Sequence, residues 1–328
     1  MRHRLASLRQ LCLAALRAAP PIPGLTEHLF SDDNDAIWQR AIERLRTARL
    51  LADDDDHSGT LDAHPLVREC FEGRLVPHAS TANGHNSHSA IPLLSFREAH
   101  SRLYEYLKNV PTMEQPDSLN EMMPLFHAIR HAHRAGDLSS AIRDVYWPRI
   151  NRGERFFSSA GCGAVGAVVT TLSGLVQDQS INDSSTTHDP TRAFVMSEYG
   201  YHLAGIGQPR NAIQKLESSY QQLVNIQDWE QAGYVSCGLA ALHVFLGNIE
   251  KGTTLARSFC HSADNTDSVF WRTVSRVALG NALNQAGQSK QSRKCFREAI
   301  SIAKPQLRTW NTSYYAASMN YVTDYCPR

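Results

Sequence analysis

The sequence has little of several features that define common classes of protein. Basic and acidic residues almost cancel, because Lys and Arg number 33 and Asp and Glu number 32, which leaves a formal net charge of +1. That balance gives no broad electrostatic case for binding nucleic acid or an anionic membrane. No apolar run reaches the roughly 20 residues that a membrane-spanning helix needs. The seven cysteines are scattered without a CxxC pair, so we interpret them as reduced thiols of a cytoplasmic protein.

Motifs for cofactor and metal binding are present only in part. Gly161, Gly163 and Gly166 spell GxGxxG, but the dinucleotide fingerprint follows a buried strand, whereas the surrounding chain has helical spacing. We interpret these glycines as a turn that opens a helix. His127 and His131 share one face of a predicted helix. A zinc protease motif would need a glutamate directly after the first histidine, and a third ligand is not evident.

The acidic stretch in the N-terminal part does not complete a calcium site either. Asp54, Asp56 and Asp62 match early positions of an EF-hand loop, but Pro65 stands where the closing glutamate belongs. No Ser/His/Asp or Cys/His arrangement can be identified from spacing alone. We therefore expect no enzyme active site, no cofactor and no metal in this chain.

Residues 1–75 are predicted to form a small winged-helix-like domain. Residues 35–51 have the spacing of an amphipathic helix, and Pro65 suits the first turn of another. Two short strand-like pieces, at 50–51 and 60–62, flank the polar turn DDDDHSG. The arginine-rich, acid-free start of the chain is typical of an ordinary first helix, which we favour, or of a mitochondrial presequence.

Four arginines on the helix predicted at 35–51, the recognition helix of the winged-helix-like domain, raise the alternative of DNA binding. They are Arg40, Arg44, Arg46 and Arg49. The aspartates at 53–56 would lie at the tip of the wing, where winged-helix proteins approach phosphate, and their charge would oppose binding. We therefore do not expect DNA to be the partner, and keep a winged-helix transcriptional regulator as the alternative function.

The rest of the chain divides at two polar segments. Residues 76–92 and 177–190 have no periodic apolar face, and we expect both to be loops, the first of them mobile. Between them, residues 93–176 are predicted to form a helical linker domain. Residues 191–328 carry an internal repeat.

The C-terminal part repeats at a fixed spacing. HLAGIGQPRNAI, HVFLGNIEKGTT and NALNQAGQSKQS align on Gly207, Gly247 and Gly287, which are 40 residues apart. Each of these glycines is predicted to end the first helix of a pair. Small residues on both sides of it would let two antiparallel helices approach closely. These small residues are Gly200, Ala240 and Gly280 before the glycine and Ala212, Gly252 and Ser292 after it.

This pattern resembles the tetratricopeptide repeat. In the first unit the matching positions are Gly200, Leu203, Ala212 and Leu216. The period exceeds the usual length of about 34 residues, which implies longer helices. The resemblance implies an all-α superhelix of helical hairpins, whose concave groove binds a protein or peptide.

The N-terminal part resembles a region of a larger family. PPIPGLTEHLF, IERLRTARLLA and LDAHPLVRECF are similar, in order and spacing, to the region after the nucleotide-binding core of bacterial NB-ARC-type signal-transducing ATPases, the STAND class. There a winged helix is followed by a helical linker and tetratricopeptide repeats, so the resemblance implies the sensor part of a STAND-type signalling system. The P-loop GxxxxGK(S/T) of those ATPases is absent. We therefore expect a truncated gene product or an ATPase core supplied elsewhere; a repeat adaptor without a signalling role stays open.

The C-terminal segment 309–326 is predicted to be the first helix of a fourth unit. Its aromatic residues include Trp310, Tyr314, Tyr315 and Tyr325, and the chain ends before a second helix can cover them. A contiguous exposed apolar patch usually marks an interface. We therefore expect either self-association through this helix or the loss of downstream repeats.

Overall fold

The structure is a computed structural model that describes residues 15–16, 20–23, 25–27, 34–51, 93–153, 156–177 and 190–304. These residues form helices, turns and short connections, and no strand occurs among them. The chain falls into two compact units. Unit 1 comprises residues 1–116 and 120–146, and unit 2 comprises residues 117–119 and 147–328. The division therefore falls inside the segment predicted to be one linker domain.

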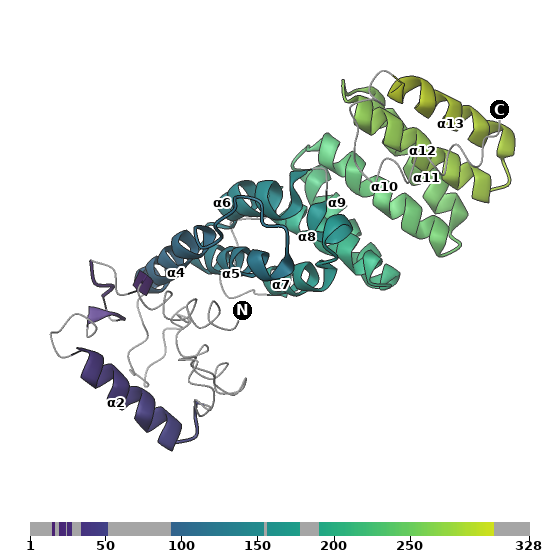
Figure 1. The fold of residues 1–328 in the computed structure, drawn as a ribbon. Helices are drawn as coiled ribbons and strands as arrows, with labels where there is room; N and C mark the ends of the chain where they lie inside the picture. Colours follow the sequence, from purple (N-terminus) through teal and green to yellow (C-terminus); the bar gives the residue numbers. More distant parts are fainter. Residues whose placement is uncertain are drawn as a thin grey trace, which may run out of the picture. The chain divides into compact units, whose positions relative to one another are not determined.

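The described helices of unit 1 bury apolar side chains on one face each. They are α2 (Asn34–Thr47), α4 (Leu93–Lys108), α5 (Leu119–Ala135) and α6 (Leu138–Ala141), which run from purple to teal in Figure 1. Phe96 and Leu107 of α4 are buried, and so are Leu125 and Ile129 of α5. The turn after α5 uses Gly136, whose φ of 85° suits a residue without a Cβ.

Two π-helical segments and one α-helix precede the repeats. They are η2 (Ile142–Asn151), η4 (Phe157–Gly161) and α7 (Val165–Gln177). Gly161 ends η4, Gly163 has a φ of 66°, and Gly166 lies in the first turn of α7. A π-helical segment precedes these glycines where the dinucleotide fingerprint would have a buried strand. The interpretation of the GxGxxG sequence as a turn that opens a helix is confirmed.

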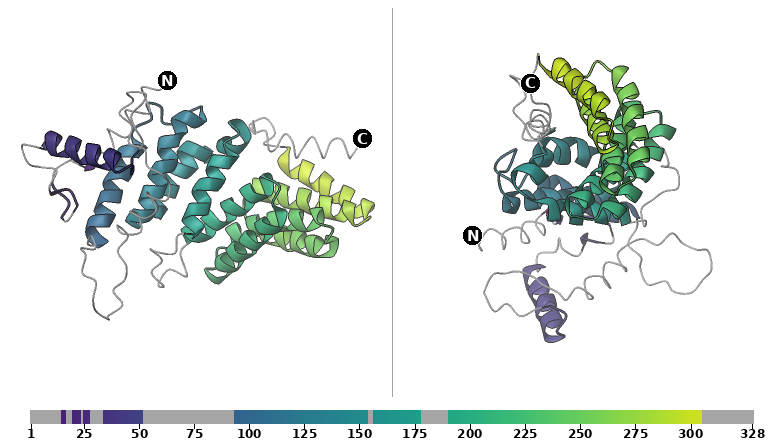
Figure 2. Two further views of the ribbon diagram at one scale, coloured as in Figure 1. Left: turned by 90° about the horizontal axis from the view of Figure 1, so that it is seen from below. Right: turned by 90° about the vertical axis from the view of Figure 1, so that its right-hand side faces the viewer.

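Residues 190–304 of unit 2 form three helical hairpins, which follow one another in Figures 1 and 2. The pairs are α8 (Pro190–Gly205) with α9 (Pro209–Asn225), α10 (Trp229–Phe245) with α11 (Ile249–Asp264), and α12 (Val269–Gln285) with α13 (Ser289–Ala303). Helices α9 and α11 also pack on the first helix of the next pair, and α10 contacts both α8 and α12. The prediction of an all-α fold, a tetratricopeptide-type superhelix, is confirmed. The first helices of the three hairpins lie on one face of it.

The turn inside each hairpin depends on a glycine. Gly207, Gly247 and Gly287 have φ values of 80°, 85° and 73°. In this left-handed region the Cβ of other L-residues comes too close to the following carbonyl oxygen, at a cost of about 1–2 kcal/mol. The turn between α9 and α10 is built differently, because Gln227 adopts a φ of 61° there.

Within the first two hairpins, the helices touch where a side chain is missing. A Cβ on Gly200 would lie 2.7 Å from Cγ of Leu216. A Cβ on Gly252 would lie 2.9 Å from the backbone oxygen of Ala240. Both distances are far below ordinary van der Waals contact, so a larger residue at Gly200 requires Leu216 to shift, and one at Gly252 requires the helices to separate.

The third hairpin adds a hydrogen bond to the same kind of contact. A Cβ on Gly280 would lie 2.6 Å from Cε1 of Phe296. The hydroxyl of Ser292 donates to the backbone oxygen of Gly280 at 2.8 Å, and both residues are buried. Ala212, at the position of Ser292 in the first hairpin, is also completely buried.

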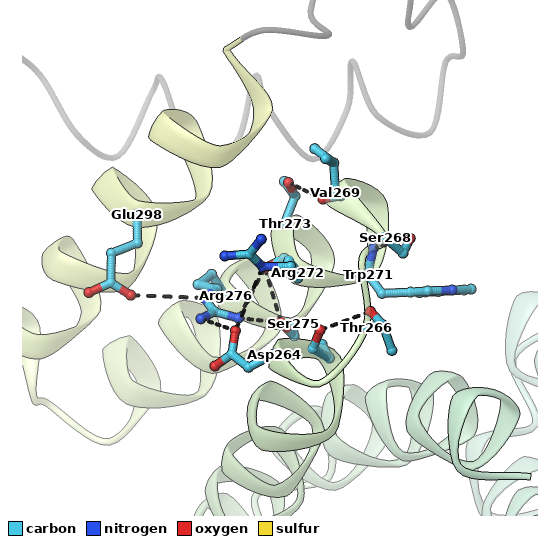
Figure 3. Close-up of polar contacts among 11 residues, drawn as sticks. Asp264, Thr266, Ser268, Val269, Trp271, Arg272, Thr273, Ser275, Arg276 and Glu298 are labelled. Carbon is cyan, nitrogen blue, oxygen red and sulfur yellow. Dashed lines mark hydrogen bonds and ion pairs between the residues drawn. The ribbon is translucent and has the colours of Figure 1, made fainter.

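One largely buried arginine links three helices of the second and third hairpins. Arg276 of α12 lies 2.5 Å from Oδ1 of Asp264 at the end of α11 and 3.9 Å from Oε2 of Glu298 on α13 (Figure 3). Arg272, one turn earlier, lies 3.9 Å from the same aspartate. The side chain of Arg276 is 13% exposed, whereas both carboxylates are nearly half exposed.

Replacing Gly247 with alanine should lower the free energy of unfolding by about 1–2 kcal/mol, because alanine is disfavoured at its positive φ. Gly174 is the matched control. It lies exposed within α7, without a positive φ and with open space around its Cβ position, so Gly174→Ala should raise the free energy of unfolding by roughly 0.5–1 kcal/mol. Denaturant unfolding of both variants, followed by circular dichroism, measures the difference. Equal effects would contradict the role assigned to the turn.

Replacing Arg276 with methionine should lower the free energy of unfolding by about 1.5 kcal/mol, the lower end of the range for hydrogen bonds to charged groups, because both carboxylates can be hydrated. The control is Lys294→Met. Lys294 lies 4.0 Å from Glu298 but is 79% exposed, and exposed ion pairs of this kind contribute little. Chemical denaturation should therefore show almost no change for this variant. A loss as large as that of Arg276→Met would mean that Glu298, rather than the buried arginine, is responsible.

Candidate functional site

The first helices of the three hairpins line one pocket of about 390 Å³. Helices α8, α10 and α12 all contribute to it, and the segment before the repeats adds Phe156, Ser159 and Val165. Its lining is mostly apolar and aromatic. Pockets of this size and composition are typical of binding sites. The described residues that line the pocket all belong to unit 2.

A row of aromatic rings runs along the pocket from α8 to α12. The ring centroids of Tyr201 and Tyr234 are 4.8 Å apart, and those of Tyr234 and Trp271 are 5.1 Å apart. Phe270 extends the row, with its centroid 4.2 Å from that of Trp271. The ring of Tyr201 occupies the space that a Cβ on Gly238 would need. The missing side chain on α10 therefore lets the tyrosine of α8 reach across.

Two of these rings donate hydrogen bonds to acceptors in the chain. The hydroxyl of Tyr201 donates to the backbone oxygen of Tyr234 at 2.8 Å. The indole Nε1–H of Trp271 donates to Oε1 of Glu230 at 3.0 Å. Both bonds join neighbouring first helices and hold the rings in place along the row.

Two ionisable residues of α8 also line the pocket. Glu198 is 2% exposed, and His202 is 6% exposed. Nδ1 of His202 lies 2.7 Å from the backbone oxygen of Glu198. A carbonyl oxygen only accepts, so Nδ1 carries the hydrogen and Nε2 of the neutral ring is an acceptor. Nε2 is buried and has no hydrogen-bond partner within the described part of the chain.

None of the small residues predicted to pack the helices lines this pocket. Their backbones lie between the helices of each pair, so they position the first helices without touching an occupant. The pocket residues were missed because the repeats were aligned only on small residues. The same 40-residue register relates Tyr201 to Ala241 and His202 to Leu242, and all four line the pocket. Comparing variable positions in that register would have found them.

Several predicted features lie outside the described residues. They are the hairpin of the winged-helix-like domain with Asp54, Asp56, Asp62 and Pro65, the loop 76–92, nearly all of 177–190, and the possible interface residues Trp310, Tyr314, Tyr315 and Tyr325. The arginines considered for DNA binding lie on α2 or just after it. Arg40, Arg44 and Arg49 are exposed, whereas Arg46 is partly buried. No helix within the described ranges is long and apolar enough to cross a membrane.

Of the two histidines considered for zinc binding, His131 pairs with a histidine of another helix. Nδ1 of His131 lies 2.7 Å from Nδ1 of His100 on α4, with the two rings stacked. The described residues contain no group of three or more His, Cys, Asp or Glu side chains that could hold a metal ion. Burial lowers the pKa of His100 to about 4. Burial, helped by the neighbouring His100, His127 and Arg130, lowers the pKa of His131 to about 3.

Solved structures similar to this chain include helical repeat proteins. BtubC (BKLC) from P. vanneervenii is 10% identical, with 94% of each chain covered and a TM-score of 0.39. A candidate kinesin light chain of Podosopora anserina, with nearly identical TPR-like repeats, is 16% identical over 65% of this chain and 90% of that one, with a TM-score of 0.37. A single-residue variant of it is 14% identical over 66% and 90%, with a TM-score of 0.38. No protein-family model and no curated protein matches the sequence.

Because His100 and His131 are buried together, we predict that the protein loses stability in acid. Because the pKa values of about 4 and 3 in the folded chain lie below the ordinary value of 6.5, only the unfolded chain takes up these protons just below pH 6.5. The free energy of unfolding should therefore fall as the pH falls from about 6.5 towards 4. Replacing His100 and His131 together with glutamine should flatten this dependence in denaturant titrations across that range. The exposed His261→Gln is the control, and an unchanged slope in the double variant would contradict the assignment.

Proposed function

We propose that this protein is a protein-interaction scaffold whose unit 2 binds a peptide segment of a partner protein in the pocket between α8, α10 and α12. The observation that carries the proposal is the pocket itself. Its aromatic row spans the first helices of all three hairpins. An elongated occupant can therefore contact successive repeats at once, which is how repeat folds use their shared face.

The arrangement favours binding over catalysis. Its rings are fixed by hydrogen bonds between the helices, and preorganised aromatic surfaces lose little conformational entropy on binding. Cys237 also lines the pocket, and burial raises the pKa of its thiol to about 12, with Cys260 adding to the shift. A thiol of that pKa stays protonated and is a poor nucleophile.

The more specific proposal is that the scaffold is the sensor part of a STAND-type signalling system. It is supported by the N-terminal sequence segments that resemble the region after the ATPase core in that family. In such a system the occupant of the pocket would be the signal, and an ATPase core supplied elsewhere would respond to it. A shared operon or direct binding of such a core to this chain would support the relation.

The pocket can be tested by filling it. Ala241 is exposed and lines the pocket, so Ala241→Trp should block it without disturbing the core. Random peptides displayed on phage are selected on the full chain, and the enriched peptides are synthesised. We expect their affinity for the Ala241→Trp variant to fall at least about tenfold, a change of about 1.4 kcal/mol, when measured by calorimetry.

The matched control places the same side chain on a second helix. Ser258 of α11 is exposed and does not line the pocket, so Ser258→Trp should bind the peptides as the original chain does. If Ala241→Trp binds them with unchanged affinity, the pocket is not the peptide site. If selection enriches no binding peptide at all, the proposed function fails.

A further inference from the structure

The outer face of α13, the last described helix (Figure 1), carries a row of basic side chains. This basic stripe consists of Lys290, Arg293, Lys294, Arg297 and Lys304. At 3.6 residues per turn, its members fall within about 100° of the helix circumference and extend for about 21 Å along the helix. All five side chains are exposed, and none of them lines the pocket. The opposite face of α13 is the one that packs, because it buries Phe296, Ala299 and Ala303.

The repeat itself does not require these charges. In the 40-residue register, the same five positions of α11 hold one cation and two carboxylates, and those of α9 hold one of each. The charged residues at these positions are Glu250, Arg257 and Asp264 on α11 and Arg210 and Glu217 on α9. The two helices nevertheless pack together in all three hairpins. The accumulation of positive charge is therefore a property of the outer face of the third hairpin and not of the fold.

The charges of the basic stripe repel one another and are barely compensated within the chain. Its first four members are spaced three and four residues apart, and like charges at these spacings destabilise a helix. Among the described residues, Glu298 is the carboxylate within 4.0 Å of the stripe, beside Lys294, and it also lies 3.9 Å from Arg276. The side chains of the other four cations have no hydrogen bond or ion pair within the described part of the chain. An anionic partner would relieve the repulsion.

The surroundings of the basic stripe favour an acidic protein segment over a nucleic acid or a membrane. Within the arc of the stripe the remaining residue is the exposed Ser301, so no aromatic ring is present on which a base of a single-stranded nucleic acid could stack. Helices that lie on membranes insert their apolar face into the bilayer, whereas the apolar face of α13 is buried in its packing with α12. The formal net charge of the whole chain is only +1, so the attraction for anions is local to the stripe.

We propose that the basic stripe of α13 binds an acidic segment of a partner protein, one with several aspartate or glutamate residues close together. Arginine binds a carboxylate through two parallel N–H···O bonds, and lysine adds a compact positive charge. From Lys290 to Arg297 the stripe covers about 10 Å of helix, which is the length of about four residues of an extended segment. The inference goes beyond the proposed function, because it assigns a second binding surface that is separate from the pocket.

The test compares an acidic peptide with a neutral peptide of the same length. The probes are an octapeptide of alternating glutamate and aspartate and its counterpart of glutamine and asparagine, both capped at their ends. Calorimetry on the full chain in about 0.01 M salt, where the Debye length is about 30 Å, should show the acidic peptide binding at least about tenfold tighter, because several exposed ion pairs add up. In about 1 M salt, where the Debye length is about 3 Å, most of this preference should disappear.

Two variants locate the preference on α13. The stripe variant, with Lys290, Arg293, Lys294 and Arg297 all replaced by glutamine, should bind the acidic peptide at least about tenfold more weakly, because each lost cation removes an ion pair. Glutamine forms helices about as well as lysine and arginine, so circular dichroism should show an unchanged fold. The matched control makes the same change in net charge at four exposed arginines elsewhere, and it should keep the preference. These are Arg40, Arg44, Arg130 and Arg210.

Several outcomes would overturn the inference. They are equal binding of the two peptides at low salt, a preference that survives in the stripe variant, and an equal loss in the control. Oligothymidylate or phosphatidylserine vesicles that bind more tightly than the acidic peptide, and only to a chain with an intact stripe, also overturn it, because the stripe would then bind another class of partner. Ala241→Trp should leave binding of the acidic peptide unchanged, and a loss there would place that peptide in the pocket instead. The proposed function is judged by the phage-selected peptides, so either proposal can fail alone.

Discussion

The close approach of two helix backbones within each hairpin is the constraint on which the rest of unit 2 depends. At Gly200, Gly252 and Gly280 the partner helix occupies the place where a Cβ would be. Dispersion contacts between surfaces this close are individually small and add up over the length of a helix. The facing positions are 200 with 212, 240 with 252 and 280 with 292, each pair 40 residues after the one before, so the close approach recurs in every hairpin and the first helices come to share one face.

The pocket forms because the side chains on that shared face differ from one repeat to the next. The helix-packing positions hold small residues in every repeat, whereas the positions that face the pocket vary widely. Where α8 carries Tyr201, α10 carries Ala241, and Gly238 leaves room for the tyrosine ring. The ring of Tyr201 on α8 thus lies over Gly238 of α10. If every repeat carried the same residue at its pocket-facing positions, the face would be either filled by large side chains or flat. Neither arrangement would enclose a cavity.

The difference between packing positions, which recur, and pocket positions, which vary, also decides how much could be predicted from the sequence. The turn glycines and small packing residues recur in register, so the repeat could be located in the sequence, and its resemblance to the tetratricopeptide repeat implied the all-α fold of helical hairpins. The pocket residues do not recur, and their significance depends on which helices become neighbours. His202 illustrates the limit, because a lone histidine in a helix carries no signal until its Nδ1 is seen to bond the backbone of Glu198. The pairing of His131 with His100 on another helix was likewise invisible, since the two are 31 residues apart.

Backbone strain differs between the hairpin turns of unit 2 and the segment that precedes the repeats. The hairpin turns avoid it by using glycine at positive φ, but Phe156, on the wall of the pocket, has a φ of 47° with a full side chain. Such a conformation costs on the order of 1–3 kcal/mol and persists only where the surroundings enforce it. Here Trp147 meets the ring of Phe156 edge-on at 6.5 Å and that of Phe194 on α8 at 5.8 Å. These contacts hold the strained residue against the first repeat, so the pocket wall is fixed by the segment before the repeats as well as by the repeats themselves.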